Sequence, residues 1–260
     1  MLPLFDTTPI RRIPYVTVLI IFIVLVVFGI QLAQPDFDYF IHRWGLIPLL
    51  FNPEGRELVL TVTTLFLHAN VFQVLSSVYF LWLFGVHVED RLGHLAFLLY
   101  FLMAGFMALM LQMMLVRFTN LPLIGASGAI TALAGTYLIY QFRSRLAIWL
   151  PVPGRFRNTY LAPSWIAILL WFATQFVVHA GKLGVVDYNI GGTAWYTHAG
   201  GLLFGVGMGL MFRAITREER TETPKPTSDT ATSEAPPANH KTANHTEAIK
   251  SLPRKAHRAV

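Results

Sequence analysis

The chain of 260 residues contains no cysteine and few charged residues, and each shortage excludes a class of protein. Without cysteine, disulfide frameworks, thiolate metal sites and cysteine nucleophiles are excluded together. Charged residues make up 13% of the sequence and hydrophobic residues 54%, against roughly 25% charged in an ordinary soluble domain. The mean hydropathy is +0.52. A soluble fold could not cover so much apolar surface, so a soluble globular protein is excluded as well.

The net charge of +6 raises the question of a nucleic-acid partner. Nucleic-acid binding needs basic residues gathered on one water-exposed face. Here the basic residues lie in loops and tails between long apolar runs, a distribution that membrane topology explains. We therefore expect the lipid bilayer as a partner of this chain and expect no nucleic acid.

Six segments are apolar enough to suggest membrane-spanning helices, each of which needs about 20 mostly apolar residues. They are Pro14–Gln34, Val71–Val86, Leu95–Val116, Leu123–Tyr140, Ser164–Ala180 and Ala194–Phe212. The second segment is short, and an extension back through Leu58–Asn70 lengthens it at the cost of including His68. The pattern predicts an all-α membrane protein, a bundle of six transmembrane helices.

The distribution of lysine and arginine between alternate loops predicts the orientation in the membrane. Ten of these residues lie on the side that holds both termini, and four lie on the other side. Both termini are therefore expected in the cytoplasm. We divide the chain into a cytoplasmic N-terminal segment (1–13), a transmembrane domain (14–213) and a cytoplasmic tail (214–260). The tail is rich in Thr, Pro, Ala, Ser, Lys and Glu and is expected to be disordered.

Two polar residues lie at equal depth in different predicted spans. Ser127 is the fifth residue of the fourth span and His198 the fifth residue of the sixth, and both spans begin on the outer side. At 1.5 Å per residue, each side chain lies roughly 6 Å below the outer edge of the apolar slab. Equal depth allows a hydroxyl and an imidazole on two helices to meet.

Small residues at three- and four-residue spacing suggest that these two spans also pack closely. The sixth span carries Gly201, Gly205 and Gly209, and the fourth carries Gly128, Ala132 and Gly135. Such stripes often do no more than pack helices together. An ionisable residue inside a membrane suggests function, however, and a neutral imidazole facing a serine hydroxyl can act as its general base.

Three motifs resemble the signatures of rhomboid intramembrane serine proteases. They are Gly125-Ala126-Ser127-Gly128, the run from His198 through Gly205, and the GxxxExxxG pattern of Gly85-Val86-His87-Val88-Glu89-Asp90-Arg91-Leu92-Gly93. The resemblance covers about Met1–Phe212. It implies a six-helix rhomboid-like bundle with a water-filled cavity open to the outside. It also implies that Ser127 is the nucleophile and His198 the general base of a Ser-His dyad.

The sequence departs from the family pattern where two oxyanion-binding residues are expected. Rhomboid proteases usually carry a His and an Asn four residues apart near the outer end of the second helix, and Gln73 and Ser77 occupy those positions here. An amide and a hydroxyl can still donate hydrogen bonds, and backbone N–H groups around Ser127, in the Gly125-Ala126 turn, would remain. We expect a slower or more selective enzyme, because loss of one oxyanion donor costs roughly 10²–10³ in rate.

The resemblance leaves an alternative open, a catalytically impaired rhomboid-like protein that binds transmembrane helices of client proteins. A transporter or channel ranks last, because such proteins need charged or unwound segments near mid-membrane and the predicted spans lack Asp, Glu and Lys. The expected partners are transmembrane protein substrates. No cofactor is expected, and no metal, because the histidines lie on opposite faces of the membrane. The opening of the chain, with Arg11-Arg12 and later Arg43-Trp44-Gly45-Leu46-Ile47-Pro48, is similar to bacterial members. This resemblance implies a multi-pass protein of the bacterial cytoplasmic (inner) membrane.

Overall fold

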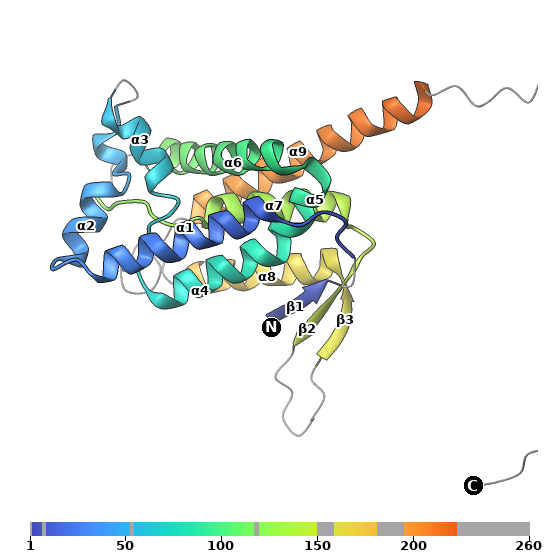
Figure 1. Ribbon diagram of the computed structural model, residues 1–260, viewed down its shortest axis with the longest axis horizontal. Helices are drawn as coiled ribbons and strands as arrows, with labels where there is room; N and C mark the ends of the chain where they lie inside the picture. The colour runs from blue at the N-terminus through green and yellow to red at the C-terminus, as the bar shows by residue number, and fades with distance from the viewer. Residues whose placement is uncertain are drawn as a thin grey trace, which may run out of the picture. The chain divides into compact units, whose positions relative to one another are not determined.

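The computed structural model describes residues 2–6, 9–52, 55–116, 120–149, 159–180 and 195–222 (Figure 1). The helices are α1 (Tyr15–Leu32), α2 (Phe37–Trp44), α3 (Arg56–Thr63), α4 (Val71–Phe80), α5 (Val86–Leu92), α6 (His94–Leu115), α7 (Ser127–Tyr140), α8 (Ser164–Ala180) and α9 (Trp195–Glu222). The strands are β1 (Leu2–Asp6), β2 (Arg145–Trp149) and β3 (Thr159–Pro163). The described chain is therefore mostly helical.

Among the residues that the structure describes, four helices are long and apolar enough to cross a membrane. They are Tyr15–Leu32, Val71–Leu92, His94–Leu115 and Trp195–Ile215. Helix α8 has the predicted bounds, Ser164–Ala180, and 17 residues, whereas α7 has only 14. At 1.5 Å per residue α7 is about 21 Å long, which is less than the roughly 30 Å of a hydrocarbon core. Four of the six predicted spans thus have the length and composition of a transmembrane helix.

The helix that forms the second span differs from the prediction, because it is extended at its C-terminal end and not at its N-terminal end. The Asn70 side chain accepts a hydrogen bond from the Gln73 N–H at 2.9 Å and caps a helix that starts at Val71. That helix continues through a π-helical segment, Leu81–Gly85, into α5 and ends before Gly93, whose φ is 81°. We call this continuous helix, Val71–Leu92, the α4–α5 helix. The predicted extension back through Leu58–Asn70 is wrong. His68 lies in the turn before the helix.

Two further boundaries differ from the predictions. Helix α7 begins at Ser127, not at Leu123, because the Leu123 N–H pairs with the Leu46 carbonyl at 2.7 Å in the preceding segment. Ser127 is therefore the first residue of its helix. Helix α9 runs past the predicted domain boundary at 213 to Glu222, through residues that favour helices. The rest of the predicted tail, 223–260, lies outside the described residues.

A small antiparallel sheet corrects the all-α prediction. Strand β2 pairs on one side with β1, where Leu2 lies opposite Trp149, and on the other with β3, where Arg145 lies opposite Pro163. Each strand has five residues. Strands this short carry a weak periodic signal and are stable only as part of a larger sheet or against other elements. Strand β3 leads directly into α8, so the sheet anchors one end of that helix.

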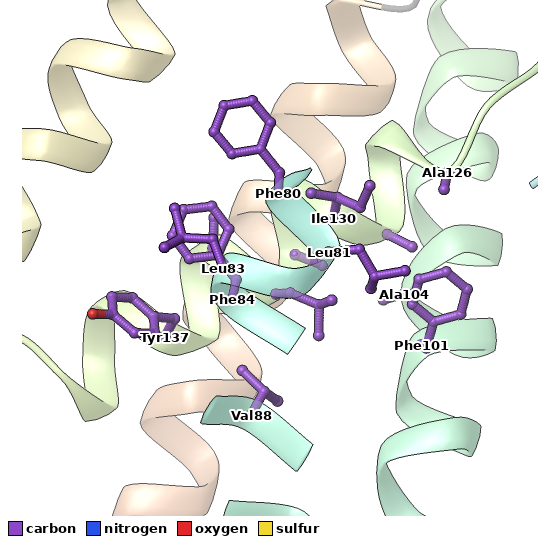
Figure 2. Packing of buried hydrophobic residues seen from close by; sticks show 14 of the residues in the cluster. Phe80, Leu81, Leu83, Phe84, Val88, Phe101, Ala104, Ala126, Ile130 and Tyr137 are labelled. Carbon is purple, nitrogen blue, oxygen red and sulfur yellow. The ribbon is translucent and has the colours of Figure 1, made fainter. Parts of the chain in front are cut away.

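The hydrophobic core lies between α1, the α4–α5 helix, α6 and α7. Figure 2 shows Phe80, Leu81 and Phe84 of the α4–α5 helix packed with Phe101 of α6 and Ile130 of α7. Leu81, Phe84 and Phe101 are fully buried or nearly so. Burial of a large apolar side chain stabilises by roughly 1.5–3 kcal/mol, so this core fixes the three elements that carry most of the site.

A buried carboxylate joins three helices at the end of the α4–α5 helix. Glu89 is fully buried and accepts hydrogen bonds from the N–H groups of Val16 and Thr17 at 2.9 and 2.7 Å. It also accepts from the Thr17 hydroxyl and from Nδ1 of His94, both at 2.6 Å. These N–H groups lie in the first turn of α1 and have no partner within that helix. We call these four residues the Glu89 cluster.

Candidate functional site

Ser127 lies at the start of α7, directly after a tight turn. Gly125 has φ 108°, a conformation that favours glycine, and its N–H donates to the Thr64 carbonyl at 2.8 Å. The Ile130 N–H donates to the Ala126 carbonyl at 2.9 Å and begins the helix ladder. The N–H groups of the preceding residues, including Ser127, have no carbonyl partner within α7. They are grouped at the helix end that carries the Ser127 side chain.

Helices α7 and α9 meet backbone to backbone. A Cβ atom added at Gly201 would collide with the carbonyl oxygen of Gly128, and one added at Gly205 would collide with that of Ala132. At Gly135 the added atom would lie 2.7 Å from the Leu202 carbonyl oxygen. The predicted contact between the two stripes of small residues is confirmed. The contact begins in the first two turns of both helices, where the two candidate catalytic residues lie.

Gln112, buried in α6, holds the start of α9. Its Oε1 accepts hydrogen bonds from the N–H and the hydroxyl of Thr197 at 3.1 and 3.3 Å. Thr197 directly precedes His198, so these bonds position the backbone from which the imidazole projects. The sequence analysis missed this residue. A signal was present, because Gln112 is the only glutamine in a long apolar helix, and buried polar side chains in membrane helices bond to their neighbours.

Ser127 and His198 line the same cavity. The described lining residues are Ser76, Ser77 and Phe80 of α4, Ser127, Ile130 and Thr131 of α7, Trp171 of α8 and His198 of α9. The cavity measures about 60 Å³, and at roughly 10–15 Å³ for each water it has room for several. Trp171 and Phe80 pack against each other in its wall, with ring centroids 4.5 Å apart. The cavity thus combines hydroxyl groups, an imidazole and aromatic walls.

Ser77 lines the cavity and bonds to a histidine outside it. Its hydroxyl lies 3.0 Å from Nε2 of His68, whose Nδ1 lies 3.1 Å from the Phe66 carbonyl oxygen. The Gln31 side chain pairs with both backbone groups of His68, accepting its N–H and donating to its carbonyl, each at 3.1 Å. His68 is fully buried, and burial lowers the pKa of its imidazole below the usual value. The imidazole is therefore neutral near pH 7.

Gln73 lies beside the turn that precedes Ser127. Its Oε1 accepts a hydrogen bond from the Ala69 N–H at 2.6 Å. A Cβ atom added at Gly125 would lie 2.8 Å from Nε2 of Gln73, so the amide nitrogen is directed at that turn. Gln73 is absent from the described residues that line the cavity. The turn that its NH₂ group faces leads into Ser127 at the start of α7.

The structure brings together most of the residues that the sequence singled out. Ser127, His198 and Ser77 line one cavity, and Gly125 and Ala126 form the turn that leads into α7. Gln73 contacts this turn from outside the cavity. Among the residues that the structure describes, no group of three His, Asp or Glu side chains is placed to hold a metal ion.

Comparison with known families gives one match. A family model described as Rhomboid domain matches residues 55–215, from α3 into α9, which is more than half of the chain. Comparison with curated proteins gives no match. The matched range contains every residue that the described cavity lining includes.

Proposed function

Because the chain belongs to the rhomboid family, we propose that it is an intramembrane serine endopeptidase that hydrolyses peptide bonds in or near transmembrane segments of membrane proteins. One observation supports this proposal most: Ser127 and His198, which come from different helices, line a single cavity. A serine hydrolase needs a hydroxyl, an imidazole that can take the hydroxyl proton, and space for water.

In the proposed first half-reaction, the Ser127 oxygen attacks the carbonyl carbon of the scissile bond while His198 takes the hydroxyl proton. The resulting tetrahedral oxyanion collapses, the carbon–nitrogen bond breaks, and His198 returns the proton to the leaving amine. General base catalysis of this kind contributes typically 10²–10⁴ in rate. The close contact of α7 with α9 and the bonds from Gln112 to Thr197 support it, because they hold the two side chains on fixed backbones.

The proposed oxyanion and substrate-binding groups surround the Ser127 turn. The N–H groups at the start of α7, after Gly125 and Ala126, have no helical partner and are the first candidates. The NH₂ group of Gln73 is directed at the same turn. Preorganised donors of this kind are worth roughly 2.7–4 kcal/mol of barrier each. Ser77, at the second of the two usual oxyanion positions, lines the cavity itself.

We propose the predicted topology along with the activity. Six spans within 14–213 place both termini in the cytoplasm and the cavity near the outer face. A bacterial cytoplasmic (inner) membrane is the proposed location. The excess of arginine on the side of the termini supports this orientation.

The alternative is a catalytically impaired rhomboid-like protein that binds transmembrane helices of client proteins. One observation favours it: the hydroxyl of Ser77, one of the two side chains that replace the usual oxyanion pair, is already bonded to His68. Such a protein would bind a transmembrane peptide without cutting it.

The deciding experiment measures cleavage of a fluorescent transmembrane peptide by the full-length protein in detergent. Ser127→Ala and His198→Ala should each lower the cleavage rate at least about a thousandfold, since removal of either member of such a pair does so in soluble serine proteases. Ser76→Ala is the matched control, because Ser76 lines the same cavity. It should retain activity within a few fold.

A fluorophosphonate probe provides an independent readout, because it labels an activated serine without a peptide substrate. Labelling at Ser127, lost in His198→Ala, supports the protease. Peptide binding without cleavage or labelling by the wild-type protein would establish the client-binding alternative. Cleavage that persists in Ser127→Ala would refute the assignment of the nucleophile.

A further inference from the structure

The hydroxyl of Ser77 can only donate, and not accept, in its hydrogen bond with His68. A carbonyl oxygen only accepts hydrogen bonds, so the Phe66 carbonyl requires the proton of the His68 imidazole on Nδ1. A neutral imidazole with its proton on Nδ1 presents a bare Nε2, and the partner of that Nε2 is Ser77, at 3.0 Å. The Ser77 proton therefore goes to His68.

The surroundings of His68 keep this polarity constant. The imidazole is fully buried in the turn before α4, and its backbone is held on both sides by the Gln31 amide of α1. Burial disfavours the imidazolium form, which alone could donate from both nitrogens. The hydroxyl of Ser77 makes no other hydrogen bond among the described residues, so both lone pairs of its oxygen remain available to a group in the cavity that it lines.

A hydrogen-bond acceptor at the position of Ser77 can serve the second half-reaction, in which water hydrolyses the acyl-enzyme. A water that attacks an acyl-enzyme must give one proton to the general base and direct a lone pair at the acyl carbon. A hydrogen-bond acceptor for its second proton fixes the orientation of the water, so that a lone pair of its oxygen faces the acyl carbon. The cavity has room for such a water between groups from α4, α7 and α9.

We propose that Ser77, polarised by His68, accepts a hydrogen bond from the water that hydrolyses the acyl-enzyme on Ser127 and so orients that water. This inference rests on the proposed protease function. His198 takes one proton of the water as its oxygen bonds to the acyl carbon. The bond between that carbon and the Ser127 oxygen then breaks, the proton passes from His198 to Ser127, and a carboxylic acid leaves. Ser77 and His68 are positioning residues in this step, and Ser77 acts as an acceptor rather than as an oxyanion donor.

The test separates acylation from deacylation in the full-length protein. Ser77→Ala should leave the rate of fluorophosphonate labelling at Ser127 within about twofold of wild type, because labelling needs the nucleophile, the base and the oxyanion donors but no water. Steady-state peptide cleavage should fall about tenfold or more, with a burst of the amine-side product as acyl-enzyme accumulates. Hydroxylamine, a nucleophile that replaces water, should restore turnover. A merely structural loss would show none of this pattern.

Two variants complete the test. Ser77→Thr keeps the hydroxyl and should restore cleavage to within a few fold of wild type, while Ser76→Ala should show neither the burst nor the loss. Labelling and cleavage that fall together in Ser77→Ala would overturn the proposal and indicate an oxyanion donor. Unchanged cleavage would overturn it too. Absence of labelling at Ser127 in the wild-type protein would instead refute the protease function on which the proposal rests.

Discussion

The continuous α4–α5 helix carries a buried polar group near each end, and the two differ in how completely they are bonded. Glu89 accepts four hydrogen bonds from α1 and α6, and it is absent from the described lining of the cavity that holds Ser127 and His198. Ser77, twelve residues earlier and roughly 18 Å away along the helix, makes one hydrogen bond and lines a cavity. A saturated polar cluster stabilises a fold, whereas free hydrogen-bonding capacity beside a cavity permits chemistry.

The comparison predicts that a substitution at Glu89 lowers the stability of the protein far more than its cleavage rate. Glu89→Ala leaves buried N–H and O–H donors of α1 without a partner, at about 1–3 kcal/mol each, and should lower the free energy of unfolding by roughly 3–5 kcal/mol. Thermal unfolding in detergent measures this loss. The cleavage rate per folded molecule should stay within a few fold of wild type. A variant with an unchanged melting temperature but little cleavage would break the comparison.

A substitution at the cavity end of the α4–α5 helix should lower the cleavage rate far more than the stability. Gln73→Glu keeps the Oε1 that accepts the Ala69 N–H but replaces the NH₂ group directed at Gly125 with a carboxylate oxygen. If that NH₂ group stabilises the oxyanion, cleavage and fluorophosphonate labelling should both fall about 10²–10³-fold. The melting temperature should change little. Equal cleavage by the variant and the wild type would leave Gln73 a purely structural role.

The contact that joins α7 to α9 should show an intermediate effect on both properties. Gly205→Ala places a Cβ atom against the Ala132 carbonyl, and overpacking of this kind costs typically 1–3 kcal/mol. Cleavage should fall as well, because His198 moves with α9. Gly207→Ala is the matched control, since no atom lies within 4 Å of its added Cβ. Equal melting temperatures for the two variants would show that the backbone contact carries little of the stability.

The candidate site was largely predictable because its residues carry local signals. Ser127 lies in a short motif, His198 precedes a glycine stripe, and depth along the predicted spans brought the two together. The predicted depth rested on a helix start four residues too early for α7, yet both residues lie in the first turn of their helices and line one cavity. The motif was therefore a better guide than the helix boundary.

The remaining features depend on contacts between distant segments, which no local pattern encodes. The Gln112–Thr197 and Gln31–His68 hydrogen bonds join segments far apart in the sequence, and only the presence of a glutamine in an apolar run hints at them. The start of α4 is an exception. Asn70 followed three residues later by Gln73 is a helix-start pattern, and it could have placed the boundary at Val71.

Strand β1 has a consequence for the order in which the protein assembles. Leu2–Asp6 pairs with Arg145–Trp149, so during synthesis β1 has no pairing partner until α7 and the strand that follows it have been made. Bringing together segments so far apart is slow, because the chain between them must lose entropy before the pairing is gained. The sheet therefore closes late, after most of the bundle is complete. A bulky tag placed before Leu2 would thus interfere with the pairing of β1 and β2. It would leave the membrane insertion of the helices that precede β2 unaffected.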